Sequence, residues 1–174
     1  MKNDDIGRVD ETAVADRLAI AEILALHSRG IDRASVEDLR AAYWPDAEVD
    51  YGGFKGLAHE FAAMVGSALD ASYELTQHAV SNSLMALSGD DARVESCVTA
   101  YHLLHGAAEE MVFSGRYLDR LQRRDGRWKL LHRQVVIDWA RRNAVDDERQ
   151  SEGFAPLARG SRDTSDPLYS FLAS

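Results

Sequence analysis

Two long strands joined by a tight turn are predicted by residues Glu110–Trp139, which read EMVFSGRYLDRLQRRDGRWKLLHRQVVIDW. Polar and apolar residues alternate through much of this stretch, which is rich in the β-branched and aromatic residues typical of strands. Asp125-Gly126 lies between the two halves and favours a two-residue hairpin turn. The stretch therefore predicts an antiparallel pair, Glu110–Gln122 and Arg127–Trp139.

Two further long strands are predicted immediately before this hairpin. Tyr73–Leu87 ends at the turn signal Gly89-Asp90-Asp91, and Ala92–His105 ends near Gly106. Since short turns separate all four segments, we expect the strands to follow one another as an antiparallel meander.

The first half of the chain predicts helices instead. Apolar residues at three-and-four spacing indicate a first helix from Glu11 to about Gly30, and Ser35 with Asp38 resembles the capped start of a second. A short strand is expected over 48–51 and a third helix over 57–69. Helices ahead of an antiparallel sheet predict an α+β domain in which the curved sheet wraps around the helices as a cone.

The chain is expected to divide into this domain, residues 1–142, and a C-terminal arm, residues 143–174. Gly153, Pro156, Gly160 and Pro167 make the arm irregular. Its last residues are nevertheless apolar, so we expect the arm to cover the mouth of the cone or a neighbouring subunit.

Composition excludes several function classes. The chain has 174 residues and a formal net charge of -9, without a basic stripe that could neutralise nucleic acid. Its single cysteine, Cys97, cannot form an internal disulfide, and the polar N-terminus does not resemble a signal peptide. We therefore expect a cytoplasmic protein that binds neither nucleic acid nor membranes.

Four short motifs, in this order and spacing, carry a family resemblance. They are Gly30-Ile31-Asp32, Tyr43-Trp44-Pro45-Asp46-Ala47-Glu48, Thr76-Gln77-His78 and Arg124-Asp125-Gly126-Arg127-Trp128-Lys129. Over roughly residues 11–139 the chain resembles the SnoaL-like family, which has the nuclear transport factor 2 fold. Among its members the chain looks most like scytalone dehydratase, hexachlorocyclohexane dehydrochlorinase and bile-acid 7-alpha-dehydratase, which perform eliminations without a metal or an organic cofactor.

The resemblance implies roles for four residues. The family's catalytic aspartate falls on Asp32, its base histidine on His78 and an arginine of the last strand on Arg133. His27 stands where relatives have a pocket lysine or tyrosine, which leaves the substrate open. The resemblance also implies no metal, no cofactor and a homotrimer. We expect a small hydrophobic substrate in a cavity lined by Tyr43, Tyr73, Tyr101, Tyr117 and Trp139.

These residue types suit proton abstraction from carbon. Histidine is the side chain whose ordinary pKa lies near neutrality, and a carboxylate on its other ring nitrogen fixes the tautomer and stabilises the imidazolium. Arg133 is predicted to stabilise the leaving group or a developing oxyanion, with His27 or a pocket tyrosine as the proton donor. The predicted function is a cofactor-independent lyase or dehydratase that acts on an aromatic, alicyclic or steroid-like molecule, by elimination or carbon–carbon cleavage.

Other interpretations remain open at this point. His27 continues an apolar helical stripe and is equally well explained as a core histidine, while His78 and Asp32 taken alone also fit structural roles. His102 and His105 are three apart in a predicted strand, so we expect them on opposite faces and not in a metal site. A ketosteroid-type isomerase and a non-catalytic small-molecule binding module are the alternative functions.

Overall fold

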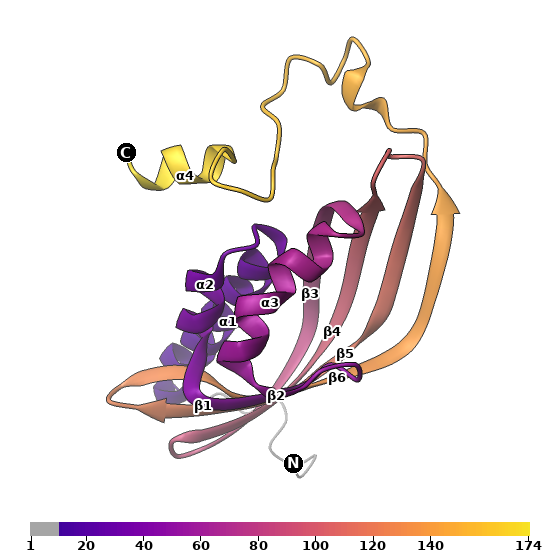
Figure 1. Ribbon diagram of the computed structural model, residues 1–174. Coiled ribbons are helices and arrows are strands. Elements are labelled where there is room, and N and C mark those ends of the chain that lie inside the picture. The colour runs from indigo at the N-terminus through magenta and orange to yellow at the C-terminus, as the bar shows by residue number, and fades with distance from the viewer. Residues whose placement is uncertain (1–10) are drawn as a thin grey trace.

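The fold is a strongly curved sheet with three helices against its concave face (Figure 1). The computed structural model describes residues 11–174. The helices are α1 (Glu11–Asp32), α2 (Val36–Ala42), α3 (Ala58–Asp70), the short 3-10 helix η2 (Glu148–Gln150) and α4 (Pro167–Leu172). The strands are β1 (Tyr43–Asp50), β2 (Lys55–Leu57), β3 (Tyr73–Ser88), β4 (Asp91–Leu104), β5 (Glu109–Arg124) and β6 (Arg127–Ala144).

The six strands form one sheet in the order β2-β1-β6-β5-β4-β3. The meander β3 to β6 is antiparallel, as predicted, whereas β1 pairs with β6 in parallel. The hairpin between β5 and β6 turns at Asp125 and Gly126, whose φ angles of 50° and 73° are the left-handed values that such a two-residue turn needs. The predicted α+β cone is therefore confirmed.

Two predicted boundaries differ from the structure for identifiable reasons. Gly30 lies inside α1 and does not end it. A Cβ at this position would be 2.8 Å from Cγ of Leu39, so the role of the glycine is to let α2 pack closely against α1. The first strand begins at Tyr43 and not at Glu48. Pro45 is accommodated because it lies in an irregular stretch of the β1–β6 pairing, where no ladder hydrogen bond is needed from it.

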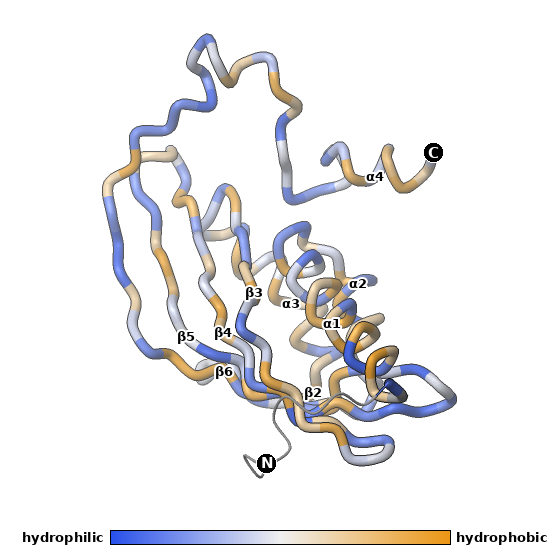
Figure 2. Tube along the Cα trace, turned by 180° about the vertical axis from the view of Figure 1, so that it is seen from behind, coloured by the Kyte–Doolittle hydropathy of each residue, from blue (hydrophilic) through white to orange (hydrophobic). Residues whose placement is uncertain are grey.

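The core lies between the helices and the lower part of the sheet. Ser35 caps α2 by accepting a hydrogen bond from the backbone N–H of Asp38, as its sequence predicts. Figure 2 shows mostly hydrophilic turns at the lower ends of the strands and apolar segments in α1 and α3. Large buried apolar residues of this core are Ile20, Leu24, Ile31, Leu39, Phe61, Val94, Leu121 and Leu130.

The C-terminal arm follows β6, which extends to Ala144, and arches over the open end of the cone (Figure 1). Its apolar end residues were expected to be buried, yet Phe171 and Leu172 are 74% and 57% exposed in this single chain. The arm is held by polar contacts instead, among them a 2.9 Å hydrogen bond from Arg33 to the carbonyl of Ser161. None of the described helices has the length and apolar character needed to cross a membrane.

Candidate active site

Asp32 and His78 are in direct contact. Asp32 is the last residue of α1, and its Oδ1 lies 2.7 Å from Nδ1 of His78 in β3. The same carboxylate accepts hydrogen bonds from the backbone N–H of His78 at 2.8 Å and from the hydroxyl of Thr76 at 2.9 Å. Because a carboxylate only accepts, the proton of a neutral His78 lies on Nδ1 and the lone pair is on Nε2.

His78 forms part of the wall of a cavity of about 300 Å³ inside the cone. Both side chains of the pair are only 10% exposed. Apart from two histidines, the lining side chains are apolar or aromatic, as expected of a small-molecule site. They are Ile31, Tyr51, Phe61, Val65, Leu69, Tyr73, His78, Ala100, His102, Met111, Phe113, Tyr117 and Val135.

His102 is the second histidine of the cavity and was not among the predicted site residues. Its ring centroid lies 5.4 Å from that of His78 and 4.7 Å from that of Tyr73. Burial, together with the nearby His78, lowers the pKa of His102 to about 4, so it is neutral at pH 7. Its Nδ1 is buried without a hydrogen-bond partner among the described residues.

A signal for His102 was present in the sequence. In β4 the even-numbered residues from Ala92 to His102 are buried and face the helices, while most odd-numbered ones are exposed. The alternation places His102 inside. His105 lies beyond the end of β4, where its Nε2 is 2.8 Å from the carbonyl of Asp70. Within residues 11–174, no group of three or more His, Cys, Asp or Glu side chains is arranged to hold a metal ion.

Arg133 is fully buried and is paired behind the cavity wall. Its Nε and Nη2 each donate a 2.7 Å hydrogen bond to the carboxylate of Asp119, its direct cross-strand partner. Its guanidinium carbon lies 3.9 Å from the ring centroid of Tyr117, which separates it from the cavity. The predicted contact of Arg133 with a leaving group is therefore not supported by this geometry, because Asp119 and Tyr117 occupy its faces.

His27 connects Arg133 to the cavity. Nη1 of Arg133 donates a 2.8 Å hydrogen bond to Nδ1 of His27, and Nε2 of His27 lies 3.3 Å from the hydroxyl of Tyr51. Since a guanidinium only donates, Nδ1 must accept, and the single proton of a neutral His27 lies on Nε2. Burial and the positive charge of Arg133 hold the pKa of His27 well below its ordinary value.

Tyr51 is the cavity end of this chain of contacts and was not among the predicted site residues. It lines the cavity and stacks on Phe61 with ring centroids 4.2 Å apart. Burial raises the pKa of its hydroxyl, so the group stays protonated. Ala47 and Val49, at alternate positions before it, are buried, and this period of two could have placed Tyr51 on the inner face.

The five predicted aromatic lining residues divide between the two faces of the sheet. Tyr73 and Tyr117 line the cavity. Tyr43 is buried behind it, with its ring 5.4 Å from that of His27. Tyr101 and Trp139 do not line the cavity and are 40% and 58% exposed; Tyr101 lies between Ala100 and His102, which do line it. The structure does not bring these two residues to the cavity, because the prediction did not fix the strand register.

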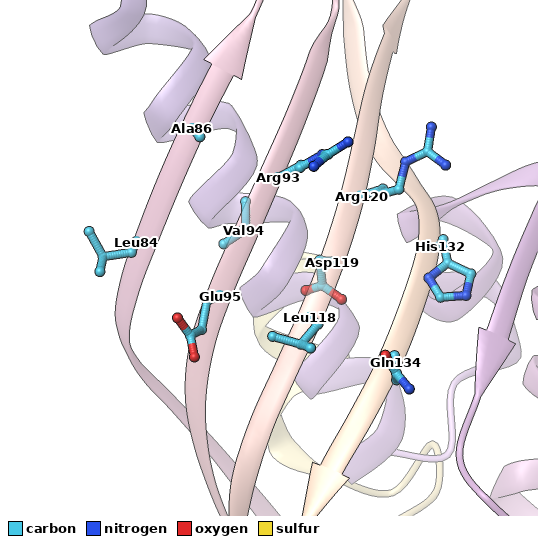
Figure 3. Close-up of a pocket in the computed structure, with 10 residues that line it drawn as sticks. All are labelled: Leu84, Ala86, Arg93, Val94, Glu95, Leu118, Asp119, Arg120, His132 and Gln134. Atoms are coloured by element: carbon cyan, nitrogen blue, oxygen red, sulfur yellow. The ribbon is translucent and has the colours of Figure 1, made fainter. Parts of the chain in front are cut away.

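A second depression lies on the opposite, convex face of the sheet and has a different character. Figure 3 shows its lining residues on β3 to β6, among them Arg93, Glu95, Arg120, His132 and Gln134. Its volume is about 420 Å³, and no residue predicted for the site belongs to it. His78 also lines, with Asp32, a more polar depression of about 550 Å³ between α1 and β3. Of these hollows, the cavity of about 300 Å³ is the one that joins a candidate base to an apolar interior.

A curved sheet wrapped around three helices, with a histidine of the inner face at the wall of a cavity, is the nuclear transport factor 2-like α+β cone. The chain belongs to the SnoaL-like domain family, whose model matches residues 12–134. An uncharacterized protein of Mycobacterium tuberculosis (strain H37Rv) is 26% identical over 124 residues, 69% of this chain and 84% of that protein.

Two solved structures illustrate the shared fold. A putative scytalone dehydratase from Novosphingobium aromaticivorans has a TM-score of 0.69 and 24% identity, and the match covers 78% of this chain and 93% of that one. A hexachlorocyclohexane dehydrochlorinase has a TM-score of 0.69 and 22% identity, with 79% of this chain and 94% of that one covered. The family resemblance expected from the sequence is confirmed.

Proposed function

We propose that this protein is a cofactor-independent lyase that uses His78 and Asp32 to remove a proton from carbon in a small hydrophobic molecule. The observation that carries the proposal is the 2.7 Å contact between Asp32 Oδ1 and His78 Nδ1, which in the neutral ring leaves Nε2 as the proton acceptor on a histidine that lines an apolar cavity. The cavity volume, about 300 Å³, suits a compact aromatic, alicyclic or steroid-like substrate.

The proposed step begins at Nε2 of His78. This atom takes the proton, the electron pair of the C–H bond becomes a carbon–carbon double bond, and the bond to the leaving group breaks. Asp32 stabilises the imidazolium through the Nδ1 hydrogen bond. A base of this kind typically contributes about 10²–10⁴ in rate, so the leaving group needs its own stabilisation.

We assign that stabilisation to Tyr51, with His102 beside His78 as a further neutral polar group. The Tyr51 hydroxyl can donate its proton to a departing oxygen or stabilise a halide while accepting from Nε2 of His27. Arg133 then acts from behind, through its hydrogen bond to His27, and not by touching the substrate. Carbon–carbon cleavage would use the same base and the same donor.

The experiment is a product screen with aromatic, alicyclic and steroidal alcohols and halides in the presence of a metal chelator. His78→Gln and Asp32→Asn should each lower kcat by at least about 10²-fold while ligand binding is retained. His132→Gln is the matched control, since His132 lies on the convex face (Figure 3).

Three results would contradict the proposal. Full turnover by His78→Gln would exclude that base. Ligand binding without turnover of any compound would favour a non-catalytic binding module. Transfer of substrate deuterium to another carbon without loss of a group would favour a ketosteroid-type isomerase.

A further inference from the structure

The C-terminal arm reaches the candidate catalytic pair through one buried arginine. The side chain of Arg162 is 6% exposed, although it lies in an otherwise largely exposed segment. Its Nη1 donates a 2.5 Å hydrogen bond to the hydroxyl oxygen of Thr76, and its Nε donates a 2.6 Å hydrogen bond to Asp70 at the end of α3. The arm therefore enters the cone at the strand that carries His78.

The contact with Arg162 determines the direction of the Thr76 hydroxyl proton. A hydroxyl has one proton, and its oxygen accepts here from a guanidinium that cannot accept in return. The proton is therefore directed to Oδ1 of Asp32, 2.9 Å away. This is the same oxygen that holds Nδ1 of His78. Arg162, Thr76, Asp32 and His78 thus form one continuous chain of hydrogen bonds.

Neighbouring contacts keep Arg162 in place. Arg33, next to Asp32 in sequence, donates to the carbonyl of Ser161 and lies 3.7 Å from the carboxylate of Asp166. Asp166 also accepts a 2.8 Å hydrogen bond from the backbone N–H of Ser161. The backbone on both sides of Arg162 is therefore tied to the end of α1. Because the apolar residues Phe171 and Leu172 are exposed, polar contacts of this kind dominate the docking of the arm.

We propose that Arg162 is a positioning residue: by holding the Thr76 hydroxyl on Asp32, the docked arm keeps the carboxylate in place against Nδ1 of His78. The effect of Arg162 on turnover rests on the proposed function, whereas its effect on the hydrogen bond between Asp32 and His78 does not. An arm that merely covers the cavity would leave this hydrogen bond unchanged when Arg162 is replaced.

The direct test is NMR of protein with nitrogen-labelled histidine, which follows the Nδ1–H proton of His78 and needs no substrate. Arg162→Met is expected to move this proton signal to higher field and to speed its exchange with water, because Asp32 is then held less firmly against Nδ1. Arg159→Met is the matched control, because Arg159 is an exposed arginine of the same arm. An unchanged His78 signal in Arg162→Met would overturn the proposal.

A second pair of variants controls for the possibility that Arg162→Met undocks the whole arm. Thr76→Val removes only the hydroxyl and leaves Arg162 its bond to Asp70, whereas Thr76→Ser keeps a hydroxyl. A shifted Nδ1–H signal in the valine variant, with the parental signal retained in the serine variant, supports the proposal. Equal signals from the two variants would refute it.

Kinetic measurements then distinguish an arm that positions Asp32 from an arm that only covers the cavity. With a substrate from the screen, Arg162→Met should lower kcat roughly tenfold, which corresponds to one hydrogen bond to a charged group, and leave KM nearly unchanged. An increase in KM alone would mean that the arm only covers the cavity. If the parent protein turns over no compound but the NMR shift is seen, the proposed function fails while the positioning role stands.

Discussion

Arg133 donates its Nη1 hydrogen to Nδ1 of His27 across 2.8 Å, and this contact fixes the histidine as the neutral Nε2–H form. His27 thereby links the buried guanidinium of Arg133 to the cavity, because its Nε2 lies 3.3 Å from the hydroxyl of Tyr51, which lines the cavity. His27 stands where the family resemblance implies a lysine or tyrosine. Tyr51, which directly follows β1, brings a hydroxyl to the cavity in contact with this histidine.

The first prediction concerns Tyr51. Tyr51→Phe removes the only hydroxyl that we place at the leaving group, so kcat should fall about 10–100-fold with a smaller change in KM. Steady-state kinetics on a substrate from the screen measures kcat and KM separately. Tyr101→Phe, on the convex face, is the control and should retain parental kinetics. A Tyr51→Phe enzyme with unchanged kcat would remove Tyr51 from the mechanism.

The second prediction concerns the buried ion pair between Arg133 and Asp119, whose side chains are both 0% exposed. Arg133→Met or Asp119→Leu alone leaves an uncompensated buried charge and should destabilise the fold by about 3–5 kcal/mol. The double variant removes both charges and should recover much of that loss. Urea unfolding of the four proteins measures the coupling, and strictly additive losses would show that the two residues do not act as a pair.

The third prediction is a loss of stability in acid. His27 and His102 have folded-state pKa values below the ordinary value, about 4 for His102, so each takes up a proton on unfolding when the pH is below about 6.5. The contribution of each is fully present above pH 6.5 and decreases as the pH falls below that value, with the loss for His102 complete near pH 4. Each proton adds a slope of about 1.4 kcal/mol per pH unit to the free energy of unfolding.

Urea unfolding between pH 4.5 and pH 7.5 checks this linkage. His102→Phe should reduce the slope by about one proton, since the phenyl ring fills the site but does not titrate. His132→Phe, on the convex face, should leave the slope as in the parent. Identical slopes for all three proteins would mean that His102 titrates equally in the folded and unfolded chain.

The fourth prediction concerns assembly. We expect a homotrimer, and the exposed Tyr101 and Trp139 give the convex face of the sheet an aromatic surface that association could bury. Light scattering should give three times the mass of the chain. Trp139→Arg should reduce the mass, while Phe171→Arg, in the exposed end of the arm, serves as the comparison. A monomeric parent protein would remove the trimer from consideration.

The local structure could be read from the sequence because its causes are local. Alternation marks β3 to β6, Asp125 and Gly126 supply the positive φ angles of the hairpin, and Ser35 caps α2. The family motifs also indicated Asp32 and His78 as a pair before any geometry was known, and the contact between them is present. In these cases neighbouring residues, or a shared family pattern, contain the information.

The tertiary structure alone decided which alternating residues face the cavity. By strict alternation Trp139 would face inward, as Arg133 and Val135 do. The pairing between β5 and β6 shifts before Trp139 is reached: Gly115 pairs with Ile137, but the next residue of β5, Ser114, pairs with Trp139, so β6 contains one extra residue. This bulge turns Trp139 to the outer face. A one-residue irregularity reverses every later side chain, and the sequence alone does not fix where it occurs.

Long-range partners were also beyond the sequence. Asp119 neutralises Arg133 from the neighbouring strand, and Arg162 meets Thr76 from a position 86 residues away in the chain. Such contacts depend on how distant segments pack, and charge or spacing alone does not select among many carboxylates and arginines. The sequence by itself determined the elements, the cone and the candidate base with its carboxylate. Only packing decided which polar groups reach that pair, because burial and register are properties of the whole fold.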